Sequence, residues 1–331
     1  MENNKPLLSV QNLCMYFPIR QNIAEILSHK EQKVVKAVDN VSFEINEGET
    51  VGLVGESGCG KSTLSKTLIN LYKPTSGTIE FADLGNISEL KGNSQKELYF
   101  NIQMVFQDPY SSLNPRKTIR QIFYEILSVH KLCSKEHMEE KTKSLLSLVG
   151  MPEYALDRLP GEFSGGQRQR IGIARALALN PRFLIADEPV SALDMSIQAQ
   201  VINLLEELKG KLNLTMLFIS HDLRVVEYIS DRVIVMYLGK IVEMAKTDDI
   251  FEKPFHPYTD ILIKAAPVMN PDDTDREYVI EGETPSPIDV PSGCRFHPRC
   301  PYATDKCREI EPELKTLDDG RKVACHYPLK R

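Results

Sequence analysis

One nine-residue stretch constrains the fold of this 331-residue chain more than any other part of it. Residues 55–63 read Gly-Glu-Ser-Gly-Cys-Gly-Lys-Ser-Thr, which fits the phosphate-loop pattern G-x-x-x-x-G-K-S. The apolar run 50–54 before it suits a buried strand, and residues 64–71 after it place apolar side chains at helical spacing. The glycines therefore fall at a strand-to-helix turn, whereas a merely incidental glycine-rich turn would need neither neighbour.

The residue types in this loop indicate how it would hold a nucleotide. Glycine reaches backbone angles that a Cβ atom forbids, so successive N–H groups can point inward beside the positive end of a helix. Lys61 can reach the outer phosphates, and Ser62 can bind Mg²⁺. We assign ATP binding to all residues of the loop, which are Gly55, Glu56, Ser57, Gly58, Cys59, Gly60, Lys61, Ser62 and Thr63.

Composition narrows the classes of function. The formal net charge of −6 argues against nucleic-acid binding through bulk charge, so we expect no nucleic-acid partner. Residues 1–6 lack the basic-then-apolar order of a signal peptide, and no uncharged apolar run approaches the ~18 residues of a membrane helix. We expect an intracellular protein whose membrane role, if it has one, depends on partners. The seven cysteines of such a chain are not expected to form disulfides.

The order of elements predicts the fold class. Apolar strands separated by helices indicate an α/β fold with a mostly parallel sheet and helical cover, and residues 34–46 alternate like an antiparallel strand. A helical block interrupts this plan, and we place a helical subdomain at about residues 107–175. From about Lys253 the chain becomes rich in proline. We therefore expect one main domain, 1–255, and a small cysteine-rich extension, 256–331.

Three local expectations complete the secondary structure. Residues 20–33 are polar and read as an insertion loop, with Ile23, Ile26 and Leu27 spaced for one helical turn. Residues 82–98 read as polar and irregular. Ser134 is the expected N-cap of the second helix in the helical block.

Two further stretches carry chemistry of the same kind. Residues 183–186 form an apolar strand that delivers Asp187 and Glu188 at its carboxyl end, where a phosphate-loop protein places a second Mg²⁺ contact and a base for the attacking water. Residues 163–167, Phe-Ser-Gly-Gly-Gln, begin a helix at Ser164 and would form a second anion-binding helix start. A capped helix alone would explain the serine and one glycine but not the whole stretch.

The phosphate loop, Ser-Gly-Gly-Gln and Asp-Glu, in this order, resemble the ATP-binding subunits of ABC transporters. The resemblance implies an ABC ATPase fold with an antiparallel β subdomain and an inserted helical subdomain. It covers residues 7 to about 255, and the signature departs mildly in beginning with Phe163 where the family usually has leucine. Gln107 matches the glutamine that senses the γ-phosphate and touches the membrane subunits, and His221 matches the histidine that contacts the γ-phosphate.

The same resemblance implies which residues contact the adenine base, Mg²⁺ and the ATP of the partner subunit. Phe17, or its neighbour Tyr16, matches the aromatic residue that stacks on adenine. Mg²⁺ would be held by Ser62, Gln107 and Asp187, and hydrolysis would depend on Glu188, His221 and Gln107. In the family two such domains face head to tail, so the ATP of the partner subunit would be contacted by Ser164, Gly165, Gly166, Gln167 and Asp194.

The segment after residue 255 extends the resemblance. Phe-His-Pro-Tyr-Thr at 255–259 and Glu-Thr-Pro-Ser-Pro at 283–287 resemble the extension of the oligopeptide and dipeptide importer subfamily, in particular its F-type subunits. That subfamily implies a second ATPase subunit that is a paralogue, two transmembrane permease subunits and an extracytoplasmic peptide-binding protein. It also implies a peripheral position on the cytoplasmic face of the membrane, with the permeases contacting residues near Gln107 to Arg120.

Four cysteines crowd the extension: Cys294, Cys300, Cys307 and Cys325. Four thiolates suit one [4Fe-4S] cluster, and zinc is the rival because it also takes four cysteines. Structural zinc sites usually use closely spaced C-x2–4-C pairs, which are absent from this spacing, and related peptide-importer subunits carry a cluster at matching cysteines. Iron is therefore favoured over zinc, and both over free thiols. Cys14, Cys59 and Cys133 have no assigned role.

The leading function is the ATPase that powers peptide import. An importer for nickel or another small solute would use a similar subunit, so it is kept as an alternative. A soluble ABC ATPase of DNA repair or translation belongs to a different class, and such proteins usually carry a coiled-coil insertion or tandem ATPase domains. The single set of motifs and the acidic charge favour the transporter.

Overall fold

The structure is a computed structural model that describes residues 5–21, 28, 31–108, 112–265 and 284–329. The chain divides into two compact units, the first built from residues 1–46, 50–90 and 221–331 and the second from residues 47–49 and 91–220. The helical turn expected around Ile23, Ile26 and Leu27 lies outside the described residues, as does Glu283 of the Glu-Thr-Pro-Ser-Pro motif.

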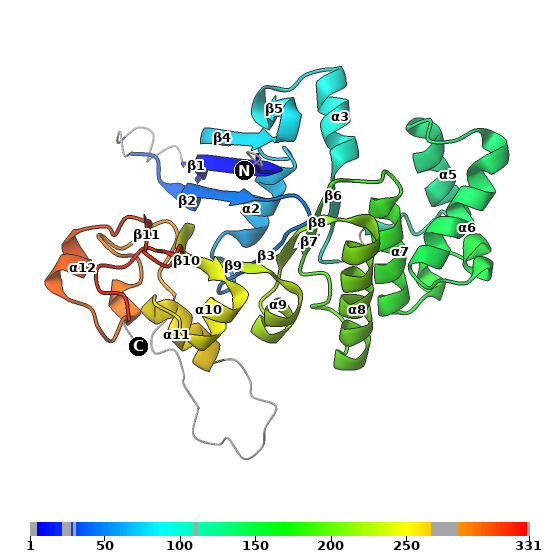
Figure 1. The fold of residues 1–331 in the computed structure, drawn as a ribbon. Coiled ribbons are helices and arrows are strands. Elements are labelled where there is room, and N and C mark those ends of the chain that lie inside the picture. The colour runs from blue at the N-terminus through cyan, green and yellow to red at the C-terminus, as the bar shows by residue number, and fades with distance from the viewer. Residues whose placement is uncertain (1–4, 22–27, 29–30, 109–111, 266–283, 330–331) are drawn as a thin grey trace, which may run out of the picture. The chain divides into compact units, whose positions relative to one another are not determined.

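The first unit contains an antiparallel sheet with the strand order β2-β1-β4-β5. Its strands are β1 (Leu8–Pro18), β2 (Val34–Ile45), β4 (Ser76–Phe81) and β5 (Gly85–Asn86) (Figure 1). Val41, Phe43 and Ile45 of β2 are buried, whereas Asn40 and Glu44 between or beside them are exposed. This alternation in β2 agrees with its sequence pattern.

A second run of strands in the same unit carries the phosphate loop. Its order is β11-β12-β10-β9-β3, where β3 and β9 are parallel and the other neighbours are antiparallel. The strands are β3 (Thr50–Val54), β9 (Arg232–Tyr237), β10 (Lys240–Lys246), β11 (Lys315–Thr316) and β12 (Lys322–Val323). All five residues of β3 are buried, which agrees with the continuous apolar run in the sequence.

Short helices accompany these strands. The α-helices are α2 (Lys61–Leu68), α9 (Leu223–Ile229), α10 (Thr247–Glu252), α11 (Pro257–Lys264) and α12 (Asp305–Glu309). The 3-10 helices are η1 (Ala82–Leu84), η2 (Ile87–Glu89) and η6 (His297–Arg299). Helix α9 packs closely on β3, because a Cβ atom on Gly52 would lie 2.4 Å from a methyl group of Val226.

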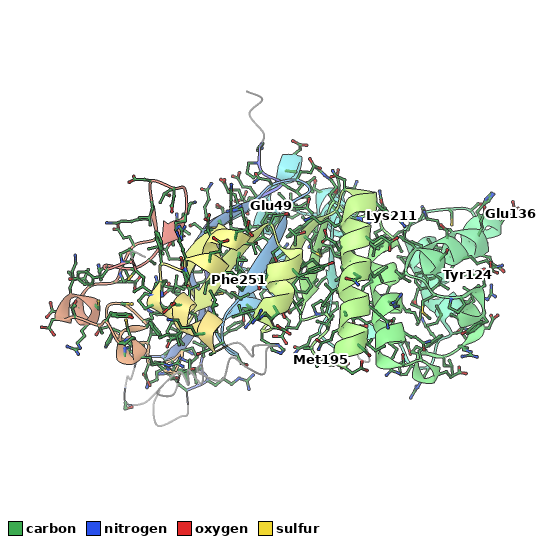
Figure 2. The ribbon with its side chains drawn as sticks, turned by 60° about the horizontal axis from the view of Figure 1, so that its bottom comes forward. Glu49, Tyr124, Glu136, Met195, Lys211 and Phe251 are labelled. Carbon is green, nitrogen blue, oxygen red and sulfur yellow. The ribbon has the colours of Figure 1, made fainter. Side chains whose placement is uncertain are left out.

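The second unit places three parallel strands beside a group of helices. Its strands, in the order β8-β7-β6, are β6 (Ile102–Val105), β7 (Phe183–Asp187) and β8 (Thr215–Ile219). Its α-helices are α3 (Asn93–Asn101), α5 (Ile119–Val129), α6 (Met138–Leu148), α7 (Gly165–Leu177) and α8 (Met195–Leu212), the last running between the labelled Met195 and Lys211 in Figure 2. Its 3-10 helices are η3 (Lys135–His137), η4 (Glu153–Asp157) and η5 (Pro160–Glu162). The predicted α/β class is confirmed.

Two local expectations need correction. Residues 82–98, expected to be irregular, contain η1, β5, η2 and most of α3, whose only buried side chain is Leu98. A single buried residue gives too weak an apolar period to be recognised in the sequence. Ser134 does not cap α6, which begins at Met138 with His137 at the N-cap position; the Ser134 hydroxyl instead lies 2.8 Å from His137 Nδ1.

The cysteine-bearing segment is anchored to the first unit. The fully buried carboxylate of Glu243 on β10 accepts hydrogen bonds from the backbone N–H groups of Phe255 (2.7 Å) and His256 (2.9 Å). Strand β12 pairs with β10, and Ala324 N–H donates to the carbonyl of Val242 at 2.8 Å. The end of the chain therefore continues a sheet that begins with the phosphate-loop strand.

Across the ranges that the structure describes, no helix combines the length and the apolar character needed to cross a bilayer.

His256 provides a pH-dependent contribution to stability. Its Nδ1 atom accepts from the N–H of Tyr258 at 3.0 Å and caps α11, and complete burial lowers its pKa to about 3. The neutral ring is therefore preferred in the folded state, and stability is lost as pH falls below the unfolded pKa of about 6.5 toward the folded value.

We expect the melting temperature to fall on acidification from pH 7 to pH 5, and His256→Asn to lose less over the same range, because asparagine keeps an acceptor at the N-cap that does not titrate in this range. Differential scanning fluorimetry at both pH values measures this. An equal loss in the parent and the variant would contradict the assignment.

Candidate functional site

The phosphate loop joins β3 to α2 in the arrangement that its pattern requires. Gly55 (φ +152°) and Gly60 (φ +108°) adopt conformations that favour glycine. A Cβ atom on Gly55 would lie 2.1 Å from the carbonyl oxygen of Met236, and one on Gly60 would lie 2.0 Å from that of Ala37. Any larger residue at these two positions would push the loop away from neighbouring backbone, so these glycines are needed by packing as well as by conformation.

Lys61 lies in the first turn of α2 and points back across the loop. Its ammonium donates to the carbonyl oxygens of Gly55 (2.7 Å) and Glu56 (3.1 Å), and only 5% of the residue is exposed. Cys59 lies beneath it, and burial raises the pKa of its thiol. Ser57, Gly58, Ser62 and Thr63 complete the loop, with Ser57 and Gly58 exposed.

The two aromatic candidates for adenine stacking differ in their partners. The Tyr16 hydroxyl donates to Asp39 Oδ1 at 2.5 Å, and burial, together with this bond, raises its pKa. The Phe17 ring packs edge-on against Tyr72, with ring centroids 5.4 Å apart. Because the hydroxyl of Tyr16 is engaged by a carboxylate, Phe17 is the residue with a purely apolar ring to offer.

In the second unit, the carboxyl end of β7 carries the predicted acids. Asp187 is 4% exposed, and Glu188 follows in a left-handed conformation with φ +47°, which is uncommon for a residue other than glycine. Gln107 Nε2 donates to Glu188 Oε2 at 2.8 Å. The N–H of Glu188 donates to the carbonyl of Ile219 at 2.9 Å, so both ends of this residue are held.

The Ser-Gly-Gly-Gln stretch begins α7 as predicted. Ser164 Oγ accepts from the N–H of Gln167 at 3.3 Å, and Gln167 Oε1 accepts from the N–H of Ser164 at 3.0 Å, which forms a reciprocal capping box. Both side chains are exposed. A Cβ atom on Gly166 would lie 2.2 Å from a methyl group of Ile197, so this glycine is explained by close packing against α8.

Asp194 lies next to this helix start. It caps α8 by accepting from the N–H of Ile197 at 3.0 Å, and it also accepts from the hydroxyl of Ser196 at 2.7 Å. The Ser196 bond and the helix N-terminus lower the pKa of its carboxyl group. Gly165 lies close to the residue before Asp194, since a Cβ atom on Gly165 would lie 3.1 Å from a methyl group of Leu193. His221 follows β8 in the chain and is exposed.

Several contacts of the phosphate loop were missed by sequence reasoning. The N–H of Glu56 donates to the hydroxyl of Tyr258 at 2.9 Å. The carboxylate of Glu56 accepts hydrogen bonds from the two terminal nitrogens of Arg299, at 2.8 and 3.0 Å, and from the hydroxyl of Thr284, at 2.8 Å. These partners come from the segment after residue 255, more than 200 positions away, and the only sequence signal was the position of Arg299 beside a cysteine of the four-cysteine pattern.

The four cysteines of the extension line one small cavity, together with His297 and His326. Burial raises the pKa of Cys294 to about 11 and that of Cys325 to about 12, and the neighbouring thiols act in the same direction. Within the described residues, no group of three or more histidine, cysteine, aspartate or glutamate side chains is arranged to hold a metal ion. The thiols therefore share a cavity without converging on one point.

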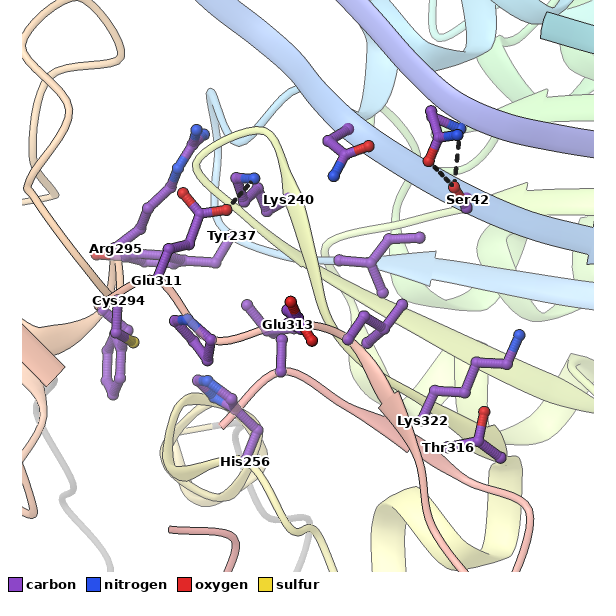
Figure 3. A pocket seen from close by; sticks show the side chains of 18 residues that line it. Ser42, Tyr237, Lys240, His256, Cys294, Arg295, Glu311, Glu313, Thr316 and Lys322 are labelled. Carbon is purple, nitrogen blue, oxygen red and sulfur yellow. Dashed lines mark hydrogen bonds and ion pairs between the residues drawn. The ribbon is translucent and has the colours of Figure 1, made fainter. Parts of the chain in front are cut away.

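Two of the larger hollows that lie within single units are lined by charged residues. One, of about 490 Å³, is lined by Tyr237, Lys240, Arg295 and Glu311 in the first unit, and Figure 3 shows the ion pair between Lys240 and Glu311 at its edge. The other, of about 860 Å³, runs along α5 in the second unit and is lined by Arg116, Lys117, Arg120 and Tyr124, the last of which is labelled in Figure 2.

Known proteins resemble both parts of the chain. The profile of the ABC transporter family matches residues 38–191, and that of the oligopeptide/dipeptide transporter C-terminal region matches residues 242–307. The oligopeptide transport ATP-binding protein AppF of Bacillus subtilis is 52% identical over 98% of both chains. The probable peptide ABC transporter ATP-binding protein y4tS of Sinorhizobium fredii is 51% identical over 97% of this chain and 89% of its own.

A solved structure agrees with these relatives. The dimeric post-hydrolysis state of the ATP-binding cassette MJ0796, bound to ADP and phosphate, is 28% identical and covers 72% of this chain and 98% of its own, with a TM-score of 0.62. The phosphate loop, the acids after β7 and the capped Ser-Gly-Gly-Gln helix all lie within the part of the chain that these comparisons match. The chain therefore belongs to the ATP-binding proteins of the ABC transporter family.

Proposed function

We propose that this chain hydrolyses ATP to power import of oligopeptides or dipeptides across the cytoplasmic membrane. The observation that carries the hydrolytic part is the hydrogen bond of Gln107 to Glu188 at the carboxyl end of β7, in a chain with a complete phosphate loop. The peptide cargo is supported by the match of residues 242–307 to the oligopeptide/dipeptide transporter region and by the names of the relatives.

Each residue has a role that follows from its chemistry. Lys61 and the loop N–H groups bind the phosphates, and the ring of Phe17 or Tyr16 stacks on the adenine base. Ser62, Gln107 and Asp187 would hold Mg²⁺, which polarises the phosphoryl oxygens when bound. Glu188 orients and deprotonates the attacking water, while His221 contacts the γ-phosphate. The bond from Gln107 holds the Glu188 side chain at this position.

The second half of each ATP site belongs to another subunit. Ser164 and Gln167 are exposed at the start of α7, Gly165 and Gly166 are its first two residues, and Asp194 caps α8, which packs against Gly166. A helix N-terminus with exposed polar side chains suits the γ-phosphate of a nucleotide carried by the facing subunit. We infer that the partner is a paralogous ATPase and that the pair closes on ATP and opens after hydrolysis.

We expect Glu188→Gln to lower ATP turnover by about 10²- to 10⁴-fold while ATP is still bound, because the base is lost and the loop is intact. Closed, ATP-bound dimers should accumulate. Turnover of the transporter complex purified from membranes measures this, and Glu207→Gln on the exposed face of α8 is the matched control. Near-parental turnover in Glu188→Gln would show that the base is another residue.

Membrane coupling is assigned to the hollow along α5. We infer that two transmembrane permease subunits dock there, close to the segment from Gln107 to Arg120, with this chain peripheral on the cytoplasmic face. An extracytoplasmic peptide-binding protein would deliver the cargo. Charged side chains line the hollow, where Lys117 pairs with Glu125 and Arg120 with Glu139 and Asp157, and Arg116 adds a further cation. Tyr124 gives the hollow an apolar wall, and this combination suits an amphipathic helix.

Arg116→Glu should reduce the amount of permease subunits that follow a tagged copy out of detergent extract by several-fold, because a rim charge is reversed. ATP binding by the chain should be retained. Lys211→Glu, on α8 outside this hollow, is the control. Equal recovery of membrane subunits with both variants would place the docking surface elsewhere, and recovery of ribosomes or DNA instead would favour a soluble ABC ATPase.

We further propose that Cys294, Cys300, Cys307 and Cys325 hold a [4Fe-4S] cluster, with Zn²⁺ as the alternative. All four line one cavity, where burial raises the pKa values of Cys294, Cys300 and Cys325, and a bound metal would stabilise the thiolate forms. The cysteines of a cubane each bind a different iron, so they need not converge on one point as around a single ion.

Anaerobically purified protein should contain about four iron atoms and acid-labile sulfide per chain, and Cys307→Ser should lower this content. Elemental analysis and absorption spectroscopy measure it, with Cys133→Ser as a control outside the cavity. Zinc, or no metal, in the parent protein would contradict the cluster.

An importer of nickel or another small solute remains the alternative within the transporter class. The match to the oligopeptide/dipeptide region favours peptides, and uptake assays with labelled peptides and with nickel distinguish the two cargos.

A further inference from the structure

The heptapeptide from Cys294 to Cys300 contacts the nucleotide-binding elements through its two arginines. Arg299 precedes Cys300, and its two terminal nitrogens donate to the two carboxylate oxygens of Glu56 at 2.8 and 3.0 Å. The side chain of Arg299 is 5% exposed and that of Glu56 is 18% exposed. A bidentate pair with so little access to water is the strong kind of ion pair, in which geometry and charge are both fixed.

This pair matters because of where Glu56 lies. It is the second residue of the loop that receives a triphosphate, and an uncompensated carboxylate there would repel the phosphates. The guanidinium of Arg299 neutralises that carboxylate, and the hydroxyl of Tyr258 accepts a hydrogen bond from the N–H of Glu56. Both the backbone and the side chain of Glu56 are therefore held by the segment that carries the cysteines.

The other arginine contacts β2, the strand that pairs with the strand of the aromatic candidates. Arg295 follows Cys294 and forms a buried ion pair with Asp39, and it also donates to the carbonyl of Leu238. Asp39 in turn accepts the hydroxyl of Tyr16. Burial alone would raise the pKa of Asp39, but the Tyr16 bond and the charge of Arg295 lower it overall. Figure 3 shows Arg295 beside Tyr237, next to Cys294.

Aromatic packing holds the middle of the heptapeptide against the first unit's core. Phe296 is 1% exposed, and its ring centroid lies 5.3 Å from that of Tyr237 and 5.3 Å from that of Tyr258. The N–H of Cys294 also donates to the carbonyl of Cys307 at 2.8 Å. A change at the cysteine cavity that shifted this segment would therefore also shift the arginine that pairs with Glu56.

We propose that Arg299 is a positioning residue for the phosphate loop, and that through it the state of the four-cysteine segment sets the affinity for ATP. The inference rests on the proposed function, because it assumes that the loop binds ATP. Arg299 neutralises and orients Glu56, and a disturbed cysteine segment releases that carboxylate toward the phosphates. The ion pair of Arg299 with Glu56 and the cysteine segment both lie in the first unit. Neither includes a residue to which we assign a role in hydrolysis.

The first test changes the pair. Arg299→Met should raise the Kd and KM for ATP on the order of tenfold, while kcat at saturating ATP stays within about twofold of the parent value. Arg299→Lys, which keeps the charge but loses the fork, should be intermediate. Titration calorimetry of the full chain with Mg-ATP, and turnover of the transporter complex, measure these values. Arg308→Met is the matched control, since Arg308 also adjoins a cysteine but pairs with exposed Asp305.

The second test removes the charge that Arg299 balances. Glu56→Gln combined with Arg299→Met should bring the affinity back to within about threefold of the parent, because no carboxylate then faces the phosphates. Failure of this rescue in protein that melts as a folded chain would overturn the charge argument. Equal affinity of the parent and Arg299→Met would overturn the inference alone, whereas a parent chain that bound no ATP would overturn the proposed function as well.

The third test addresses the cysteines. Cys300→Ser should weaken ATP binding several-fold in the parent background and leave it unchanged in the Glu56→Gln/Arg299→Met background. An equal loss in both backgrounds would show that the effect bypasses the ion pair. An unchanged affinity in the parent background would disconnect the cysteine segment from the loop.

Discussion

The structure depends on how closely backbone can approach backbone around the phosphate loop. Gly55 and Gly60 lie where any Cβ atom would collide with the carbonyls of Met236 and Ala37. The first carbonyl belongs to β9 and the second to β2, so the loop is shaped by two strands that are distant in sequence. Anion binding by inward-pointing N–H groups requires this fixed shape, because a mobile loop would lose entropy whenever it bound phosphate.

The same strands connect the loop to the end of the chain. Strand β10 continues from β9, holds Phe255 and His256 through the buried Glu243, and pairs with β12. The segment after residue 255 is thus a structural part of the phosphate-loop unit. This explains why Tyr258 and Arg299 can reach Glu56, and it gives the extension a physical route by which to affect nucleotide binding.

The candidate site residues of the second unit lie at two helix starts and at a residue with a left-handed backbone conformation. Ser164 and Asp194 each end a loop by capping a helix, and the packing of Gly166 on Ile197 brings the two starts together. Glu188 keeps an uncommon backbone conformation because its N–H bonds to Ile219 and its side chain accepts from Gln107. Strain of this kind persists only where surrounding contacts compensate for it, and it positions a carboxylate at the end of a strand.

Local patterns in the sequence determined the α/β class, the strand-to-helix context of the phosphate loop, and the acids that follow the apolar strand 183–186. These features depend on neighbouring residues, whose spacing is visible in a linear chain. The sequence also placed Ser164 at a helix start, because capping needs only the next three residues. It failed for residues 82–98, where α3 buries a single side chain and so shows no period.

Tertiary structure alone decided which distant residues hold the loop. Glu56 pairs with Arg299 across 243 positions, and Asp39 pairs with Arg295 across 256. Nothing local distinguishes these arginines from the exposed Arg308, since each lies beside a cysteine. Their partners are chosen by the pairing of β12 with β10 and by the packing of Phe296 on two tyrosines, which are long-range contacts that a one-dimensional pattern does not encode.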